Sequence, residues 1–317
     1  MSLTRLQEKI DKLKNPTVVG LDPDLAHIPK HILDKHITET GETLEAAAHA
    51  VYEFNVGLID ALYDIVPAVK PQSAFYETLG HHGILTLSKT CEYAKSKGMY
   101  VIIDGKRNDI GSTATAYSAA YLGTVRIGST EIKPFDGDAL TVNAYLGSDG
   151  IKPFLETAVK YDKAIFALIK TSNPSAGELQ DKLIDEETLY TTVGRLMEEI
   201  SKDTIDKYGY TRVGAVVGAT YPKEAEFLRK QLKNTFFLVP GYGTQGGSAE
   251  EAANAFDNNG RGAIVNSSRG IITAWKKHNL TTKADTQPST TSVLQPWAAA
   301  AREEALNMRD ALRRAIY

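Results

Sequence analysis

The sequence predicts an α/β fold, a TIM (β/α)8 barrel with an additional C-terminal helix. Eight short apolar segments alternate with segments of helical periodicity. The length of 317 residues accommodates one barrel of about 250 residues. Polar and charged residues follow the ends of several apolar segments, where barrels of this type carry their active sites. An open, doubly wound sheet shows the same alternation, but eight units within a single-domain length favour the closed barrel.

The predicted elements follow one another along the chain, beginning with an amphipathic helix at residues 3–14. Apolar segments that we expect to form strands lie at 17–22, 65–70, 101–103, 139–143, 164–172, 213–218, 235–240 and 262–266. Helical periodicity lies between them at 42–64, 83–97, 112–122, 149–160, 185–207, 224–231 and 248–258. Short apolar segments of this kind are typical of parallel strands that are buried on both faces.

The last part of the chain is predicted to be an addition to the barrel. Residues 280–292 are rich in Thr and Ser and lack periodicity, which indicates a linker. Residues 294–316 return to helical periodicity with one apolar face, formed by Leu294, Trp297, Ala301, Ala305, Met308, Leu312 and Ile316. We therefore expect residues 1–279 to form the barrel domain, and residues 280–317 to form a polar linker and a helix that packs on it.

The composition argues against several functional classes. A net charge of −3 provides no basic footprint for nucleic acid or an anionic membrane. The single cysteine, Cys91, excludes an internal disulfide framework and a cysteine-based metal site. No acids and histidines cluster at metal-ligand spacing, so we expect no metal. No run of eighteen apolar residues and no signal-peptide core are present, so we expect a cytoplasmic protein.

The densest chemistry follows the apolar segment 101–103. Asp104 and Lys106 are two residues apart, so on a strand they share one face at its carboxyl end, and Asp109 lies beyond. An ion pair with a helix N-cap is the structural alternative. Two carboxylates beside one ammonium leave an excess negative charge, and a like-charge contact at 4 Å costs about 4 kcal/mol at an effective dielectric of 20. An active site can use that arrangement to set pKa values, which favours function.

Lys70 ends the second predicted strand in an apolar setting, where an unpaired ammonium is costly. Asp104 on the neighbouring strand is the natural partner, so we expect an alternating charged chain of Lys70, Asp104, Lys106 and Asp109. Buried ionic chains stabilise a fold less well than apolar packing does, and this again favours function.

Two further groups follow later strands. The glycine-rich segment 241–247 can aim backbone N–H groups at an anion, with Gln245 as a side-chain donor, and Arg269 after the eighth strand can grip phosphate oxygens. The alternative for segment 241–247 is a hairpin-like turn. Ser172 lies in a Thr-Ser-Asn-Pro segment whose hydroxyls and amide suit a planar base, although such a segment also forms an ordinary turn.

Together these motifs resemble the orotidine 5′-phosphate decarboxylase family, in its longer bacterial branch. The resemblance covers about residues 17–275. It rests on Asp104-x-Lys106-x-x-Asp109-Ile110 with Thr113, on Leu21-Asp22-Pro23, on Lys70, on Pro240-Gly-x-Gly-x-Gln245-Gly-Gly and on Ser268-Arg269. One departure is Gly105, where many members carry a bulkier residue.

The resemblance implies decarboxylation of orotidine 5′-phosphate to UMP in pyrimidine biosynthesis, without a metal or organic cofactor. It implies that Asp104 and Lys106 face the reacting carbon, that Asp22 and Lys70 hold ribose hydroxyls, and that Ser172 recognises the pyrimidine. It implies that Gln245 and Arg269 bind the 5′-phosphate. It also implies a homodimer in which Asp109, Ile110 and Thr113 reach the neighbouring site.

Two alternatives remain open on the sequence. One is a Mg²⁺-dependent sugar-phosphate lyase or decarboxylase of the same barrel superfamily, which shares a related Asp-x-Lys-x-x-Asp motif. The other is a nucleotide-binding protein without catalytic activity, against which the intact Asp104, Lys106 and Asp109 argue.

Overall fold

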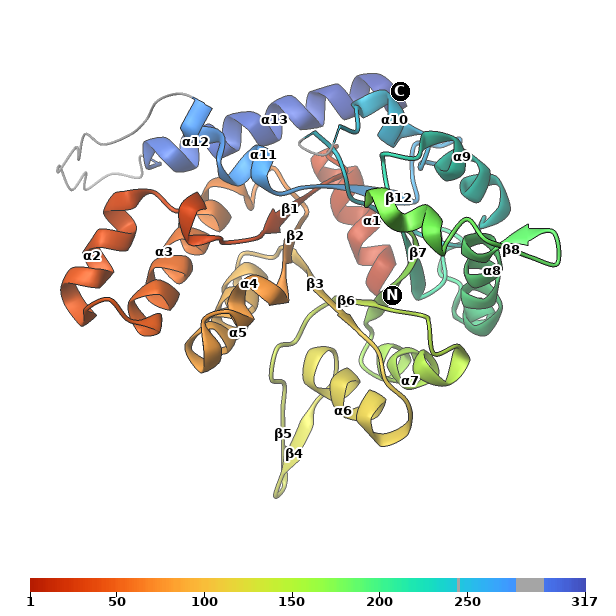
Figure 1. The fold of residues 1–317 in the computed structure, drawn as a ribbon, viewed down its shortest axis with the longest axis horizontal. Coiled ribbons are helices and arrows are strands. Elements are labelled where there is room, and N and C mark those ends of the chain that lie inside the picture. The colour runs from red at the N-terminus through yellow and green to blue at the C-terminus, as the bar shows by residue number, and fades with distance from the viewer. Residues whose placement is uncertain (244–245, 278–293) are drawn as a thin grey trace.

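The computed structural model describes residues 1–243, 246–277 and 294–317. In these residues eight parallel strands close into a barrel in the order β1-β12-β11-β10-β7-β6-β3-β2, which confirms the predicted fold (Figure 1). The barrel strands are β1 Thr17–Leu21, β2 Ala68–Pro71, β3 Tyr100–Arg107, β6 Ala139–Val142, β7 Ala164–Lys170, β10 Val213–Val217, β11 Phe237–Val239 and β12 Ala263–Ser267.

One helix, α1 Ser2–Leu13, precedes the first strand, and the helices that follow the strands lie around the outside of the barrel (Figure 1). These later helices are α3 Leu44–Leu62, α5 Gly80–Ser96, α6 Gly111–Tyr121, α7 Lys152–Lys160, α8 Leu189–Ser201, α9 Pro222–Gln231, α10 Ala249–Ala253, α11 Arg269–Ile272, α12 Ala274–Lys277 and α13 Pro296–Ile316. No helix in the described ranges is both long enough and apolar enough to span a membrane.

Several smaller elements in the described part of the chain were not predicted from the sequence. These are helices α2 Lys30–Thr40 and α4 Ser73–Glu77, four 3₁₀ turns, and two antiparallel hairpins, β4 Val125–Ile127 with β5 Thr130–Ile132 and β8 Leu183–Ile184 with β9 Glu187–Thr188. The β8–β9 hairpin occupies the start of the segment predicted as helix 185–207. Its turn residues Asp185 and Glu186 have positive φ angles, which end any regular helix there.

Other boundaries differ for local reasons. The second strand begins at Ala68 rather than at residue 65, because the amides of Ile65 and Val66 donate to the carbonyl of Leu62 and thereby finish α3. The predicted helix 248–258 shortens to α10, which a capping box between Ser248 and Glu251 begins.

The interior of the barrel follows the two-residue period of its strands. Inward side chains form one apolar cluster, which includes Val18, Ala68, Tyr100, Ile102, Ala139, Phe166, Leu238 and Ile264. Leu3, Leu6 and Ile10 of α1 belong to the same cluster, so α1 closes the amino end of the barrel. The next inward positions toward the carboxyl ends are polar on several strands, and they line the cavity described below.

The additional C-terminal helix is present as α13, which packs against α3, α10, α11 and α12 (Figure 1). The ring of Trp297 lies 5.0 Å from that of Phe54, centroid to centroid. Gly57 makes this possible, because a Cβ at that position would come within 2.3 Å of the indole. The predicted apolar face is buried at Trp297, Ala301, Ala305, Met308 and Leu312. The predicted linker at 280–292 lies outside the described residues.

Candidate active site

A cavity of about 470 Å³ opens at the carboxyl end of the barrel. Strand-end side chains and the loops that follow them form its walls. The lining residues are Asp22, Lys70, Gln72, Asp104, Lys106, Leu168, Thr171, Ser172, Asn173, Gln180, Val216, Leu238, Pro240, Gly241, Tyr242, Asn266, Ser268 and Arg269. Seven residues predicted for the site lie here: Asp22, Lys70, Asp104, Lys106 and Ser172, together with Ser268 and Arg269 from one motif.

Asp104 is the centre of the charged wall. Its Oδ2 accepts hydrogen bonds from Lys70 Nζ at 2.6 Å and from Gln72 Nε2 at 2.9 Å. Its Oδ1 accepts from Lys106 Nζ at 2.6 Å and from Thr141 Oγ1 at 2.8 Å. The carboxylate is buried, and all four of its acceptor positions are filled. The donors come from β2, β3 and β6 and from Gln72, which directly follows β2.

The same contacts explain the charge state of Asp104. Burial alone would raise the pKa of its carboxyl group, but the ammonium groups of Lys70 and Lys106 outweigh that effect and hold the pKa well below its ordinary value. Burial lowers the pKa of Lys70, whereas the carboxylates of Asp104 and Asp22 raise it, and the net shift is upward. Asp104 and Lys70 are therefore both charged at neutral pH.

The backbone at Lys106 departs from regular strand geometry, and this departure directs its side chain toward Asp104. Its φ angle is +46°, in the left-handed region that L-residues seldom adopt. The pairing of β3 with β6 shifts register at this point, between Ile103 and Arg107. As a result the Lys106 side chain, which is 47% exposed, lies on the cavity side together with Asp104. The shared face predicted from the spacing is present, but a bulge rather than a regular strand produces it.

Asp109, Ile110 and Thr113 lie apart from this cavity. None of the three lines it within the described chain. Asp109 Oδ1 accepts a hydrogen bond from the Ile110 amide, and Ile110 is 56% exposed. Among the described residues of one chain, the ion pairs of this group join Lys70, Asp104 and Lys106, and the expected fourth member, Asp109, is not paired with Lys106. Asp109 lies in the three-residue connection between the end of β3 at Arg107 and the start of α6 at Gly111, outside the residues that line the cavity.

The opposite wall is apolar. Leu168, Val216, Leu238 and Pro240 come from β7, β10 and β11 and from the residue after β11. Above them lies the segment that carries Ser172. Gln180 fixes this segment, since its Oε1 accepts from the Thr171 amide at 2.9 Å and its Nε2 donates to the Thr171 hydroxyl at 2.7 Å. Apolar side chains together with hydroxyl and amide groups in one cavity suit a planar heterocycle that carries polar edges.

The glycine-rich segment turns back on itself. Gly241, Gly243 and Gly246 have positive φ angles, which glycine adopts without strain. The amides of Gly243, Gly246 and Gly247 donate to carbonyls of the same segment, so these three are engaged within the turn rather than aimed outward. Gln245 lies outside the described residues. Arg269 begins α11 and is exposed at the cavity rim, where it provides the positive charge at this end.

The model of the family described as "Orotidine 5'-phosphate decarboxylase / HUMPS family" matches residues 18–281. A protein from Rhodopirellula baltica named orotidine 5′-phosphate decarboxylase is 46% identical over 282 residues, which cover 89% of this chain and 91% of that protein. One of the same name from Caldicellulosiruptor bescii is 43% identical over 274 residues, 86% of this chain and 90% of that protein.

The chain belongs to the orotidine 5′-phosphate decarboxylase family. Solved structures agree with this membership. The chain matches the Leishmania donovani OMP decarboxylase with a TM-score of 0.69 and 27% identity, covering 99% of both chains. It matches the Leishmania donovani UMP synthase with a TM-score of 0.71 and 30% identity, covering 99% of this chain and 56% of that longer one.

Two residues that line the cavity, Gln72 and Asn266, and one that lies behind it, Thr141, were not predicted as site residues. Gln72 and Thr141 bind Asp104, and Asn266 lines the cavity with its Oδ1 buried and without a hydrogen-bond partner in the described chain. The two-residue period could have found two of them. Gln72 lies two positions after Lys70, and Thr141 lies two positions after the inward-facing Ala139.

The family departure at Gly105 has a local explanation. Its added Cβ would come within 3.2 Å of Leu140 and 3.4 Å of Arg107, so it is packed by side chains of β6 and β3 and faces away from the cavity. Within the described ranges, no three His, Cys, Asp or Glu side chains lie close enough together to hold a metal ion.

Proposed function

We propose that this chain decarboxylates orotidine 5′-phosphate to UMP in pyrimidine biosynthesis, as a carbon–carbon lyase that needs no cofactor. The observation that carries the proposal is the arrangement of Asp104 and Lys106. A buried, fully hydrogen-bonded carboxylate holds an ammonium at the open side of the cavity, 2.6 Å away. Family membership supports the same reaction.

The cavity offers a place for each part of the substrate. Arg269 binds the 5′-phosphate at the rim, where a forked guanidinium suits phosphate oxygens. Gln245, which we expect to share this role, lies outside the described residues. Asp22 and Lys70 hold the ribose hydroxyls, and Ser172 binds the pyrimidine edge against the apolar wall. Three cations and two carboxylates line this space, namely Lys70, Lys106, Arg269, Asp22 and Asp104, and the net positive charge favours an anionic nucleotide.

Lys106 performs the chemistry. The bond between C6 and the carboxylate carbon breaks, CO₂ leaves, and the electron pair stays on C6. The ammonium of Lys106 stabilises that developing negative charge and then donates a proton to C6, so that UMP forms and a neutral amine remains. The amine regains its proton from solvent. Because the ammonium lies in place before the reaction, little reorganisation is required.

Asp104 has two effects on this reaction. It keeps the ammonium of Lys106 in place through their 2.6 Å hydrogen bond. It also lies where the substrate carboxylate approaches, so the repulsion between the two carboxylates is relieved as CO₂ departs. The low pKa of Asp104 matters here, because a protonated Asp104 would provide neither effect.

We also propose a homodimer in which Asp109, Ile110 and Thr113 complete the site of the partner. In one chain these residues lie outside the cavity, and Ile110 presents an exposed apolar side chain directly after Asp109. Mixing Lys106→Ala and Asp109→Ala tests this proposal. Each variant alone should be inactive, whereas a mixed dimer contains one intact site and regains up to about a quarter of the activity by random exchange. Failure of the mixture to regain activity would contradict the shared site.

The division of the chain into domains and its cellular compartment are two further proposals. We propose that residues 1–279 form the catalytic barrel and that residues 280–317 are an addition held through α13. The cavity-lining residues in the described ranges all lie between Asp22 and Arg269, which supports this division. We further propose that the enzyme acts in the cytoplasm, where nucleotides are made.

The deciding experiment is a turnover assay with orotidine 5′-phosphate, run with and without exhaustive chelation. We expect UMP and CO₂ to form at the same rate in both, and Lys106→Ala to be inactive. Loss of activity on chelation, restored by Mg²⁺, would favour the metal-dependent sugar-phosphate enzyme. Tight nucleotide binding without turnover would indicate a binding protein instead.

A further inference from the structure

Thr141 connects the two residues on which the proposed chemistry depends. Its hydroxyl donates to Asp104 Oδ1 at 2.8 Å and accepts from the backbone amide of Lys106 at 2.9 Å. Thr141 is 1% exposed and lies in the middle of β6. A hydroxyl group is one of the few side-chain groups that donates and accepts at a single atom, and Thr141 uses both capacities here.

The register of the two strands shows why this contact matters. Ile103 lies opposite Leu140, whereas Arg107 lies opposite Val142, so the three residues 104–106 of β3 oppose Thr141 alone. Such a bulge leaves backbone groups without a ladder partner. The Lys106 amide is one of them, and it donates to the Thr141 side chain instead of to a backbone carbonyl.

The bulge also sets the direction of the Lys106 side chain. With a φ angle of +46°, Lys106 has a backbone conformation that a non-glycine residue keeps only when its surroundings enforce it. The hydrogen bond from its own amide to Thr141 is a direct restraint on that conformation. The second hydrogen bond of Thr141 restrains the carboxylate that receives the Lys106 ammonium.

We propose that Thr141 is a positioning residue that holds the β3 bulge and thereby aims the Lys106 ammonium at the reacting carbon. This inference rests on the proposed function for its kinetic consequences, but its structural consequence is independent of it. Thr141 does not line the cavity in the described chain, so it acts through Lys106 and Asp104 rather than on the substrate.

Thr141→Val provides the sharpest test, because valine has nearly the same shape and lacks the hydroxyl. We expect kcat to fall about a hundredfold, the cost of a misplacement of about 1 Å in a catalytic group. KM should stay within about threefold, because the phosphate is bound at Arg269, away from the bulge. Thr141→Ser keeps the hydroxyl and should recover most of kcat, whereas Thr141→Ala should not. The serine and alanine pair decides the question even if the valine variant folds poorly.

A matched control separates positioning from general packing. Thr211 is also 1% exposed, and its hydroxyl donates to the Val213 carbonyl at 3.1 Å, away from the cavity. Thr211→Val should lower stability without changing kcat. Equal losses of kcat in Thr141→Val and Thr211→Val, or a serine variant no better than alanine, would overturn the proposal.

A crystal structure of Thr141→Val gives a readout that needs no activity. We expect the φ angle of Lys106 to leave the left-handed region and the distance from Lys106 Nζ to Asp104 Oδ1 to exceed that in the parent chain. An unchanged Lys106 would contradict the positioning role. If the parent chain did not decarboxylate orotidine 5′-phosphate, the proposed function would fail, while this structural test of Thr141 would still stand.

Discussion

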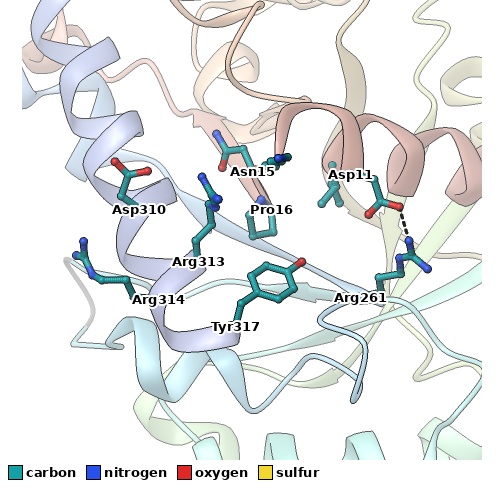
Figure 2. Close-up of a pocket in the computed structure, with 10 residues that line it drawn as sticks. Asp11, Asn15, Pro16, Arg261, Asp310, Arg313, Arg314 and Tyr317 are labelled. Carbon is teal, nitrogen blue, oxygen red and sulfur yellow. Dashed lines mark hydrogen bonds and ion pairs between the residues drawn. The ribbon is translucent and has the colours of Figure 1, made fainter.

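The two ends of the barrel each carry a charged hollow, and they differ in how the charges are held. The carboxyl-end cavity is the smaller, at about 470 Å³ against about 660 Å³ at the amino end. The amino-end pocket lies between α1, α13 and the segment before β12 (Figure 2). It is lined by Ile10, Asp11, Lys14, Asn15, Pro16, Arg261, Asp310, Arg313, Arg314 and Tyr317.

The charges of the amino-end pocket have an ordinary structural explanation. Lys14 caps the C-terminus of α1, and Arg313 and Arg314 lie in the last turn of α13, where cations complement the partial negative charge of a helix end. These three side chains are exposed. Figure 2 shows Arg261 facing Asp11 across the pocket, and that ion pair, at 2.9 Å, is part-exposed on both sides.

At the carboxyl end, by contrast, Lys70 and Asp104 are buried in the barrel, where ionic groups cost free energy unless each is paired. The volume of a hollow and the number of charges that line it therefore do not distinguish an active site from a structural pocket. Buried charges with every acceptor filled, next to a partly exposed ammonium, are the distinguishing feature. Substitutions at matched positions in the two hollows test this difference.

Substituting a lysine in each hollow should give the largest difference in turnover between the two. Lys106→Ala should reduce turnover more than about 10⁴-fold, because it removes both the proton donor and the charge that stabilises the carbanion. Binding of UMP, measured by calorimetry, should persist. Lys14→Ala in the amino-end pocket should leave turnover unchanged. Undiminished turnover in Lys106→Ala would refute its assignment.

Substituting an aspartate in each hollow should give the next largest difference, in the free energy of unfolding. Asp104→Asn should destabilise the fold by about 3–5 kcal/mol, because it leaves the buried ammonium of Lys70 without its main counter-charge. Asp11→Asn removes the part-exposed pair with Arg261 and should cost about 0–1 kcal/mol. Urea unfolding of the three proteins measures both values. Equal costs would show that burial does not distinguish the two pairs.

The contribution of Asp104 should also depend on pH. Its pKa is lower in the folded chain than the value of about 3.9 in the unfolded chain, so its stabilisation is present above that value and is lost as pH falls through the lower folded pKa. The raised pKa of Lys70 keeps its own contribution intact below the ordinary lysine value. The stability difference between the parent and Asp104→Asn should thus be constant from about pH 5 to 8 and shrink below about pH 4. A difference that is constant down to pH 2 would contradict this.

Substituting an arginine in each hollow should give the smallest difference, in KM. Arg269→Ala should raise KM about 10- to 100-fold, the value of a lost hydrogen bond to a charged group, because it removes the phosphate contact. Its effect on the melting temperature should be slight, since Arg269 is exposed. Arg313→Ala, at an equally exposed arginine of the amino-end pocket, should change neither quantity. An unchanged KM in Arg269→Ala would remove that residue from the phosphate site.

Much of the site could be predicted because it depends on local patterns. The two-residue period of β2 predicts that Lys70 lies beyond the apolar positions of that strand, and the period of β3 predicts the same for Asp104 and Lys106. The carboxyl ends of parallel strands meet at one edge of the barrel, so these side chains come together there. The same patterns could not predict that Asp109 leaves the cavity, since that follows from where the chain turns into α6. Gln72 and Thr141 share the two-residue period of these positions, but an uncharged polar side chain there does not by itself indicate a site.

The amino-acid sequence was thus sufficient for the order of the main strands and helices, for the apolar interior, and for placing Lys70, Asp104 and Lys106 at the strand ends, because these depend on residues close together along the chain. The folded barrel was needed to show that Gln72 and Thr141 join the two lysines as donors to the Asp104 carboxylate. That convergence depends on the register between β2, β3 and β6 and on the bulge at Lys106. Register between strands is fixed when the barrel closes and its side chains pack, and no periodicity within a single strand encodes it.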